Sequence, residues 1–138
     1  MKDKLLILRI ANTIGLPVVN KRKLHNTFID IFFDKIKTGY MYDSVGTYKD
    51  FIPVNKLSEI IFKLIQKNSY GIFNVSTGKK VYINKIVEWL NYHNKYNTIV
   101  IPLEKKFNKD NFTLDNSKLI NEIKIKISLS DLKNECIK

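Results

Sequence analysis

The sequence predicts an α/β domain, in which β-strands and α-helices alternate along the chain. Residues 5–10 form a nearly continuous apolar run, which is typical of a parallel strand covered on both faces. Apolar residues then recur at helical spacing in several later segments, with turn-forming residues between them. The chain has 138 residues, of which 44% are hydrophobic, and this suffices for one domain with a sizeable core.

The first half of the chain is expected to hold three strands and one helix. The strands are expected at residues 5–10, 40–42 and 48–54. The first of them should end in a loop that contains Asn12 and Gly15. The helix is expected over residues 24–36, whose apolar side chains share one helical face, and Gly39 follows its end.

The second half is expected to continue the alternation. Strands are expected at residues 72–75, 98–101 and 112–114. Helices are expected at residues 57–65, 83–90, 115–119 and 128–136. Asn55 is expected to cap the first of these helices, and Ser128 with Asp131 forms a start similar to a capping box for the last. Pro102 should stop the strand before a charged loop at residues 104–110.

The net charge of +11 first suggests a polyanionic partner. However, residues 1–69 carry 12 basic and 6 acidic groups, and residues 70–138 carry 12 and 7, so the charge is spread evenly. Arg9 and Arg22 are the chain's only arginines, and arginine is the side chain suited to bidentate reading of bases. A lysine-rich solvated surface is therefore favoured over a nucleic-acid site.

Cysteine, histidine and leader patterns exclude several classes of protein. The single cysteine cannot form an internal disulfide, and with two distant histidines it gives no metal-ligand pattern. Arg9 interrupts the apolar run near the N-terminus, and no small-residue cleavage site follows it. No stretch approaches the ~20 apolar residues that span a bilayer, so a cytoplasmic protein is expected.

Four motifs stand in order along these elements. Residues 8–15 read L-R-I-A-N-T-I-G, and residues 48–57 read Y-K-D-F-I-P-V-N-K-L. Residues 71–78 read G-I-F-N-V-S-T-G, while T-L-D-N-S-K-L at 113–119 and K-I-S-L at 126–129 close the series. Each is similar to a segment of the NAD-dependent epimerase/dehydratase family, the extended short-chain dehydrogenases that act on nucleotide sugars. The resemblance covers essentially the whole chain but somewhat under half of a full-length family member.

The resemblance implies the C-terminal part of a Rossmann-type extended short-chain dehydrogenase. Residues 1–138 would supply two parallel strands of the cofactor-domain sheet and a small α/β substrate-binding subdomain, with the N-terminal cofactor-binding half absent. The sequence contains no G-x-x-G-x-x-G turn, which would cradle a pyrophosphate. It also contains no Tyr-x-x-x-Lys pair, the family's acid/base group. We therefore expect no catalytic residue in this chain.

The resemblance also assigns candidate binding residues. Asn12 matches the family residue that contacts the diphosphate of the nucleotide sugar, and Lys49 stands where an arginine usually grips its phosphates. Ala11 and Thr13 would flank the nicotinamide of NAD or NADP, whereas Asp50 matches a structural acceptor. Plainer roles remain open: Asn12 as support for its own loop, Lys49 as a surface lysine, and Ala11 and Thr13 as strand-end packing. Arg9 is expected to be buried and paired.

Function and partners follow from this resemblance. The chain would form the sugar-nucleotide-binding part of an NAD(P)-dependent epimerase, dehydratase or reductase, and would be inactive alone. The ligand would be a UDP-, dTDP- or GDP-linked sugar, and the partner a separately encoded N-terminal half or a second copy of this chain. The alternatives are a basic nucleic-acid-binding module and an interaction subunit without a ligand.

Overall fold

The computed structural model describes residues 5–15, 39–44, 46–94, 97–103 and 111–136. The strands are β1 (Leu6–Ile10), β2 (Asn12–Ile14), β3 (Tyr40–Ser44), β4 (Tyr48–Lys49), β5 (Phe51–Pro53), β6 (Gly71–Val75), β7 (Val81–Tyr82) and β8 (Ile99–Leu103). The helices are α2 (Val54–Gln66), α3 (Ile83–Asn94), α4 (Ser117–Ile123) and α5 (Leu129–Cys136). The expected helix at 24–36 and charged loop at 104–110 lie outside the described residues.

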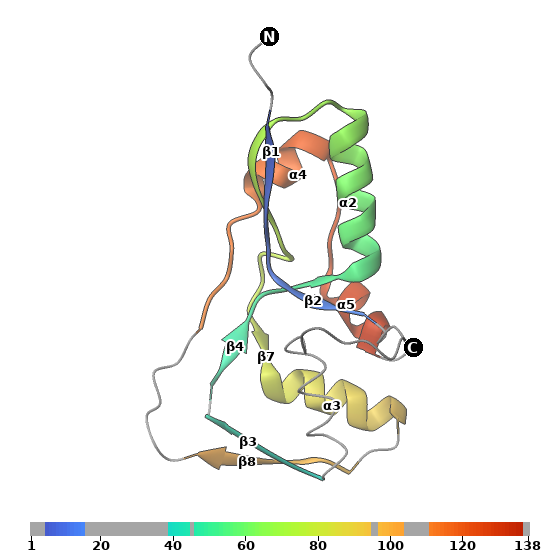
Figure 1. Ribbon diagram of the computed structural model, residues 1–138. Coiled ribbons are helices and arrows are strands. Elements are labelled where there is room, and N and C mark those ends of the chain that lie inside the picture. The colour runs from blue at the N-terminus through green and yellow to red at the C-terminus, as the bar shows by residue number, and fades with distance from the viewer. Residues whose placement is uncertain (1–4, 16–38, 45, 95–96, 104–110, 137–138) are drawn as a thin grey trace, which may run out of the picture.

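Two parts follow one another along the long axis of the molecule (Figure 1). One part holds the parallel pair β1–β6 with α2 and α4, and the other holds the parallel pair β3–β8 and the antiparallel pair β4–β7 with α3. The parallel pair β2–β5 and α5 lie between them (Figure 1). The α/β class and the parallel strands expected from the sequence are thus confirmed.

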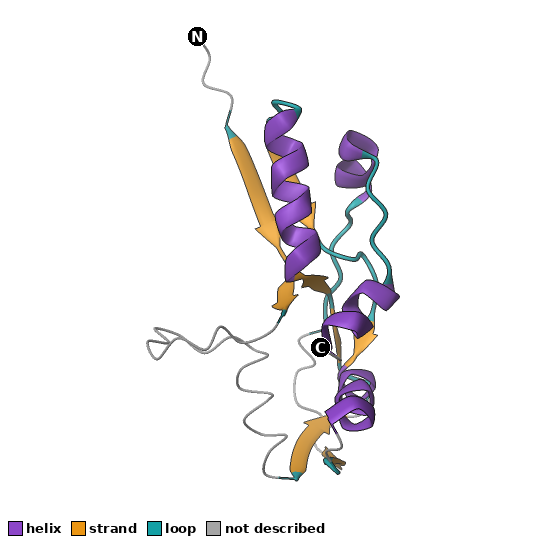
Figure 2. Ribbon diagram, turned by 90° about the vertical axis from the view of Figure 1, so that its right-hand side faces the viewer, coloured by secondary structure: helices purple, strands orange, loops and turns teal. Residues whose placement is uncertain are grey.

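α2 and α4 cover one face of the β1–β6 sheet, as the side view in Figure 2 also shows for α2. Ile60 and Leu64 of α2 and Leu119 of α4 pack with Phe73 and Val75 of β6, and all five side chains are buried. This agrees with the buried helical stripe expected between residues 57 and 65 at Ile60 and Leu64, whereas Ile65, at the end of that stripe, is 62% exposed. Burial of each such side chain contributes about 1.5–3 kcal/mol.

The opposite face of this sheet is open within the described residues. Leu5, Ile7 and Ile72 are 66%, 41% and 42% exposed, and the parallel register places Ile7 beside Ile72. Arg9 is also exposed, so the expectation that it is buried is wrong. The expectation assumed that β1 is covered on both faces, and the described part of this chain covers only one.

The two edges of the β1–β6 sheet differ. The Gly71 N–H donates to the Leu5 carbonyl, so alternation along a parallel ladder turns every second residue of β1 away from β6. The residues turned to the free edge are Leu6, Leu8 and Ile10. No described strand pairs with that edge. At the far edge of β6, the Lys118 ammonium donates to the Ile72 carbonyl at 2.9 Å, and this edge is covered.

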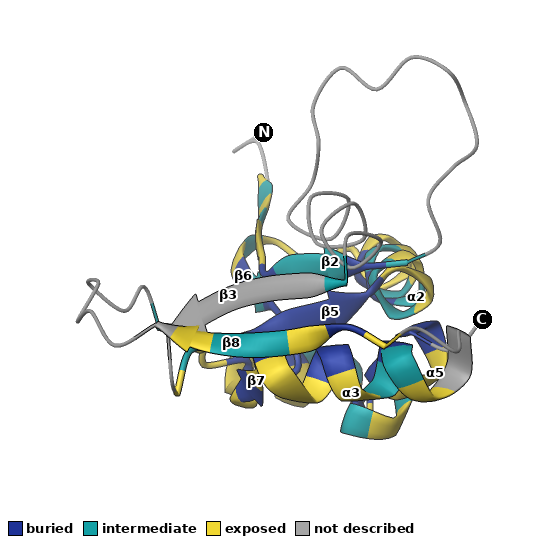
Figure 3. Ribbon diagram, turned by 90° about the horizontal axis from the view of Figure 1, so that it is seen from below, coloured by how far each residue is buried: buried dark blue, intermediate teal, exposed yellow. Residues whose placement is uncertain are grey.

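Ala11 marks the point where the chain changes partner. β1 before it pairs with β6, whereas β2 after it pairs in parallel with β5, placing Asn12 beside Phe51. The expectation of a loop at Asn12 is therefore wrong. Pairing with β5, whose residue Phe51 lies 39 residues further along the chain, holds this segment in a strand conformation. All three residues of β5 are buried, and β5 is dark blue along its length in Figure 3.

A second apolar cluster fills the part around α3. Ile83, Ile86, Val87 and Leu90 are buried on α3, as the helical spacing predicts, and they pack with residues of β5, β7 and α5. Two other expectations differ from the structure. Pro102 lies within β8 and does not stop it, and residues 112–114 form no strand.

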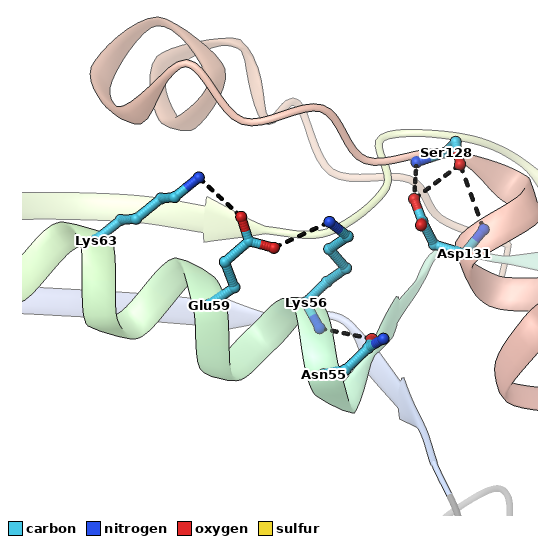
Figure 4. Close-up of polar contacts among 6 residues, drawn as sticks. All are labelled: Asn55, Lys56, Glu59, Lys63, Ser128 and Asp131. Carbon is cyan, nitrogen blue, oxygen red and sulfur yellow. Dashed lines mark hydrogen bonds and ion pairs between the residues drawn. The ribbon is translucent and has the colours of Figure 1, made fainter.

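The N-termini of α5 and α2 can be compared with the capping residues expected from the sequence. Ser128 and Asp131 form the expected box: the Ser128 N–H donates to Asp131 Oδ2 at 2.8 Å, and the Asp131 N–H donates to Ser128 Oγ at 3.3 Å (Figure 4). Asn55 is not an N-cap, because α2 begins at Val54 with Pro53 in the cap position. Its Oδ1 instead accepts from the Lys56 N–H (Figure 4).

Candidate functional site

Segments that are distant in sequence meet beyond the carboxyl ends of β1 and β6, and the Asp50 carboxylate joins them. Asp50 is fully buried, at 0% exposure. Its Oδ1 accepts from the Phe51 N–H and from the Thr77 hydroxyl, both at 2.8 Å. Its Oδ2 accepts from the Leu114 N–H at 3.0 Å. Asp50 is thus the structural acceptor that the sequence resemblance implied, and it ties β5 to the segments that follow β6 and precede α4.

Asn12 lies at this junction and is half-buried. Its Nδ2 donates to the Asp50 carbonyl at 3.3 Å, so the side chain supports the bend between β4 and β5. This differs from the plainer role expected for Asn12, support for its own loop, because the acceptor lies 38 residues away along the chain. The position of Asn12 directly beyond β1 also places it where α/β sheets bind ligands.

Lys49 immediately precedes Asp50 and lies two residues before Phe51, the register partner of Asn12. The fold therefore brings Lys49 and Asn12 to the same end of the sheet. Lys49 is half-buried and pairs with Val81 across the β4–β7 ladder. Its ammonium lies 5.4 Å from the centroid of the Phe112 ring, which is within the range of a cation–π contact.

Ala11 and Thr13, on either side of Asn12 in the sequence, lie in different environments. Ala11 is buried, and its N–H donates to the Val75 carbonyl at 3.0 Å. Thr13 is half-buried and pairs with Ile52. Their assignment to a nicotinamide stays a prediction.

The segment at residues 111–116 borders the site and was not singled out as part of it by sequence reasoning. The buried Asn116 amide donates to the Ser76 carbonyl at 2.8 Å, next to the turn at Gly78. Gly78 has φ +68°, and a Cβ there would lie 2.9 Å from Asn116 Oδ1, so only glycine fits without displacement. The contact between Asn116 and Ser76 joins residues 40 positions apart, so no local sequence pattern predicts it.

We also considered the other hollows and reactive side chains of the described residues as candidate sites. A hollow of about 540 Å³ lies at the opposite, amino end of β6, where Ser69 Oγ donates to Glu122 Oε1 at 2.7 Å. Burial raises the pKa of the Cys136 thiol to about 12, which keeps it protonated. Across the described ranges, no three His, Cys, Asp or Glu side chains gather as metal ligands. None of the described helices combines the length and apolar character that a bilayer crossing requires.

Solved structures share the fold of this chain. The UDP-N-acetylglucosamine 4-epimerase of Methanobrevibacter ruminantium, in complex with UDP-N-acetylmuramic acid, matches 96% of the chain with a TM-score of 0.74 and 20% identity. The Bordetella bronchiseptica enzyme WbmG, in complex with NAD, matches 98% of the chain with a TM-score of 0.73 and 23% identity. RMD of Pseudomonas aeruginosa, complexed with NADPH, matches 96% of the chain with a TM-score of 0.71 and 14% identity. The chain has the fold of these proteins.

This shared fold spans less than half of each matched structure: 44%, 42% and 45% of those three chains. The chain matches no protein-family model and no curated protein by sequence. The resemblance to the NAD-dependent epimerase/dehydratase family, first carried by short motifs, is confirmed at the level of the fold. The Rossmann-type α/β class is confirmed with it.

Proposed function

We propose that this chain forms the nucleotide-sugar-binding side of an NAD(P)-dependent enzyme that epimerises, dehydrates or reduces nucleotide sugars. The observation that supports the proposal is that Asn12, directly beyond β1, donates to the backbone carbonyl of Asp50, the residue next to Lys49. Crevices at this end of a parallel sheet are the usual ligand sites of α/β folds. Lys49 supplies the positive charge that a diphosphate needs, and Asn12 supplies a polar amide beside it.

The proposed roles of the chain are binding and orientation. Lys49 neutralises the diphosphate, Asn12 orients it, and Ala11 and Thr13 border the nicotinamide of NAD or NADP. The sequence offers no glycine turn for the pyrophosphate. When bound, NAD(P) supplies hydride transfer. This chain offers no Tyr-x-x-x-Lys pair, so we expect no activity from it alone.

The missing groups are proposed to come from a cofactor-binding half that docks on β1. Among the described residues, no strand pairs with the outer edge of β1, so its backbone groups on that side can receive an added strand. Phe62 and Ile65 on the outer side of α2 are 61% and 62% exposed, and Ile7 and Ile72 are exposed on the sheet. A cofactor-binding half, on this or another polypeptide, would cover these surfaces. The cytoplasmic location expected from the sequence belongs to the same proposal.

Calorimetric titration tests the binding proposal. The chain, with and without a complementary cofactor-binding half, is titrated with UDP-glucose, dTDP-glucose and GDP-mannose. We expect saturable binding of at least one sugar, and a loss of about tenfold or more in affinity for Lys49→Ala. Lys126→Ala is the matched control, because Lys126 is an exposed lysine between α4 and α5. Absence of heat with every sugar in both arms would overturn the proposal.

The net charge keeps a nucleic-acid-binding module as the second candidate. This alternative predicts binding to RNA or DNA whose affinity falls steeply with salt, together with indifference to nucleotide sugars. An interaction subunit without a ligand predicts stable association with a partner and no binding of either kind. Gel filtration of the chain alone distinguishes a second copy from a cofactor-binding half as that partner.

A further inference from the structure

Residues 111–114 contact the segment 46–50, which contains β4, through three hydrogen bonds. The Tyr48 N–H donates to Asn111 Oδ1 at 3.0 Å, and Asn111 Nδ2 donates to the Gly46 carbonyl at 3.4 Å. The Leu114 N–H donates to Asp50 Oδ2 at 3.0 Å. The backbone on both sides of Lys49 is therefore fixed by this segment, although more than 60 residues separate the partners.

Phe112 lies between Asn111 and Leu114, the two residues that make these hydrogen bonds, and its ring is next to Lys49. Its ring centroid is 5.4 Å from the Lys49 ammonium, and both residues are half-buried. A lysine ammonium is a point charge on a flexible four-carbon stem, unlike the planar fork of an arginine. Contact with a ring face restricts that flexibility.

We propose that Phe112 is a positioning residue for Lys49: its ring holds the ammonium in place for the diphosphate of the ligand. The inference rests on the proposed function, since it assigns to Lys49 the role of phosphate contact. Phe112 touches no ligand in this arrangement and acts through Lys49. Asn111 and Leu114 fix the segment that carries the ring.

A double-mutant cycle tests the proposal on the full chain, in the condition that gives saturable binding. The probe is whichever of UDP-glucose, dTDP-glucose and GDP-mannose binds. Phe112→Leu should weaken binding about two- to fivefold, the size of an exposed cation–π contact. Phe112→Tyr, which keeps the ring face, should stay within about twofold of the parent. In the Lys49→Ala background, Phe112→Leu should have no further effect, because the ring acts through the lysine.

The outcomes separate this inference from the proposed function. Binding that responds to Lys49→Ala but not to Phe112→Leu overturns the role of Phe112 alone, and so does an equal effect of Phe112→Leu in both backgrounds. Tighter binding by Phe112→Leu also overturns it, since the ring would then sequester the ammonium. Binding that ignores Lys49→Ala, or no binding of any probe, overturns the phosphate role of Lys49 first and the inference with it. NMR of ¹³C-methylated lysines adds a readout without ligand: the Lys49 signal must shift in Phe112→Leu, and an unchanged signal overturns the contact.

Discussion

Replacing Asp50 by asparagine should destabilise the fold because one acceptor oxygen becomes a donor. The carboxylate accepts two hydrogen bonds on Oδ1 and one on Oδ2. If the asparagine oxygen keeps the first two, its NH₂ group faces the Leu114 N–H at the 3.0 Å position of Oδ2. An unsatisfied buried donor costs ~1–3 kcal/mol, and two bonds to a neutral acceptor are each weaker than bonds to a charged one. Relief of charge burial offsets part of this, leaving roughly 2–3 kcal/mol.

Urea unfolding, followed by the fluorescence of the single tryptophan, Trp89, measures this cost. With an m-value of about 1.5 kcal/mol/M, the Asp50→Asn midpoint should fall by about 1.3–2 M. Asp115→Asn is the control, because Asp115 is exposed and both of its bonds from Ser117 go to one oxygen that asparagine retains. An Asp50→Asn midpoint equal to that of the control would refute the view that this carboxylate organises the site.

Three further predictions concern stability and reactivity. The hydroxyl and backbone N–H of Ser128 lower the pKa of Asp131, so the stabilisation from these two bonds is complete above the ordinary carboxyl pKa and is lost as the pH falls through the lowered value. In urea unfolding, Ser128→Ala should therefore cost about 1 kcal/mol at pH 7 and less in acid, where the bond from the Asp131 N–H to Ser128 Oγ still contributes. Gly78→Ala should destabilise by at least about 1 kcal/mol by the same measurement, because φ is +68° and the new Cβ meets Asn116, and unchanged stability would contradict that geometry. The Cys136 thiol, with its pKa raised to about 12 by burial, should react with a thiol reagent at pH 8 only after unfolding in urea, so fast labelling of the native chain would count against its burial.

Local patterns predicted what local contacts decide. The Ser128–Asp131 box depends on residues three apart, and the buried stripe of α3 depends on one helical period, so both could be read from the sequence. Asn55 failed as a cap because Pro53, already extended at φ −64° and ψ 138°, lets the helix begin one residue before it. The cap is thus shifted by two residues, from 55 to 53, which is within the usual uncertainty of a helix boundary.

Contacts over long sequence separations set the remaining features. Asn12 begins a strand because β5 pairs with it, and a run that ends near Gly15 gives no sign of that partner. Phe112 and Asn111 border the candidate site through contacts across about 63 residues, so no spacing rule could have found them. Arg9 was misjudged for the same reason, since its burial depends on what covers the outer face of β1.

The unequal edges of the β1–β6 sheet limit how this chain can assemble. Within the described residues, Lys118 donates to the Ile72 carbonyl on the outer edge of β6, so the open edge of this sheet is the one along β1. A sheet with two free edges can grow indefinitely, whereas a sheet with one stops after a single addition. Assembly through β1 should therefore be closed, with one partner for each copy, and concentrated samples should yield discrete pairs, not fibres.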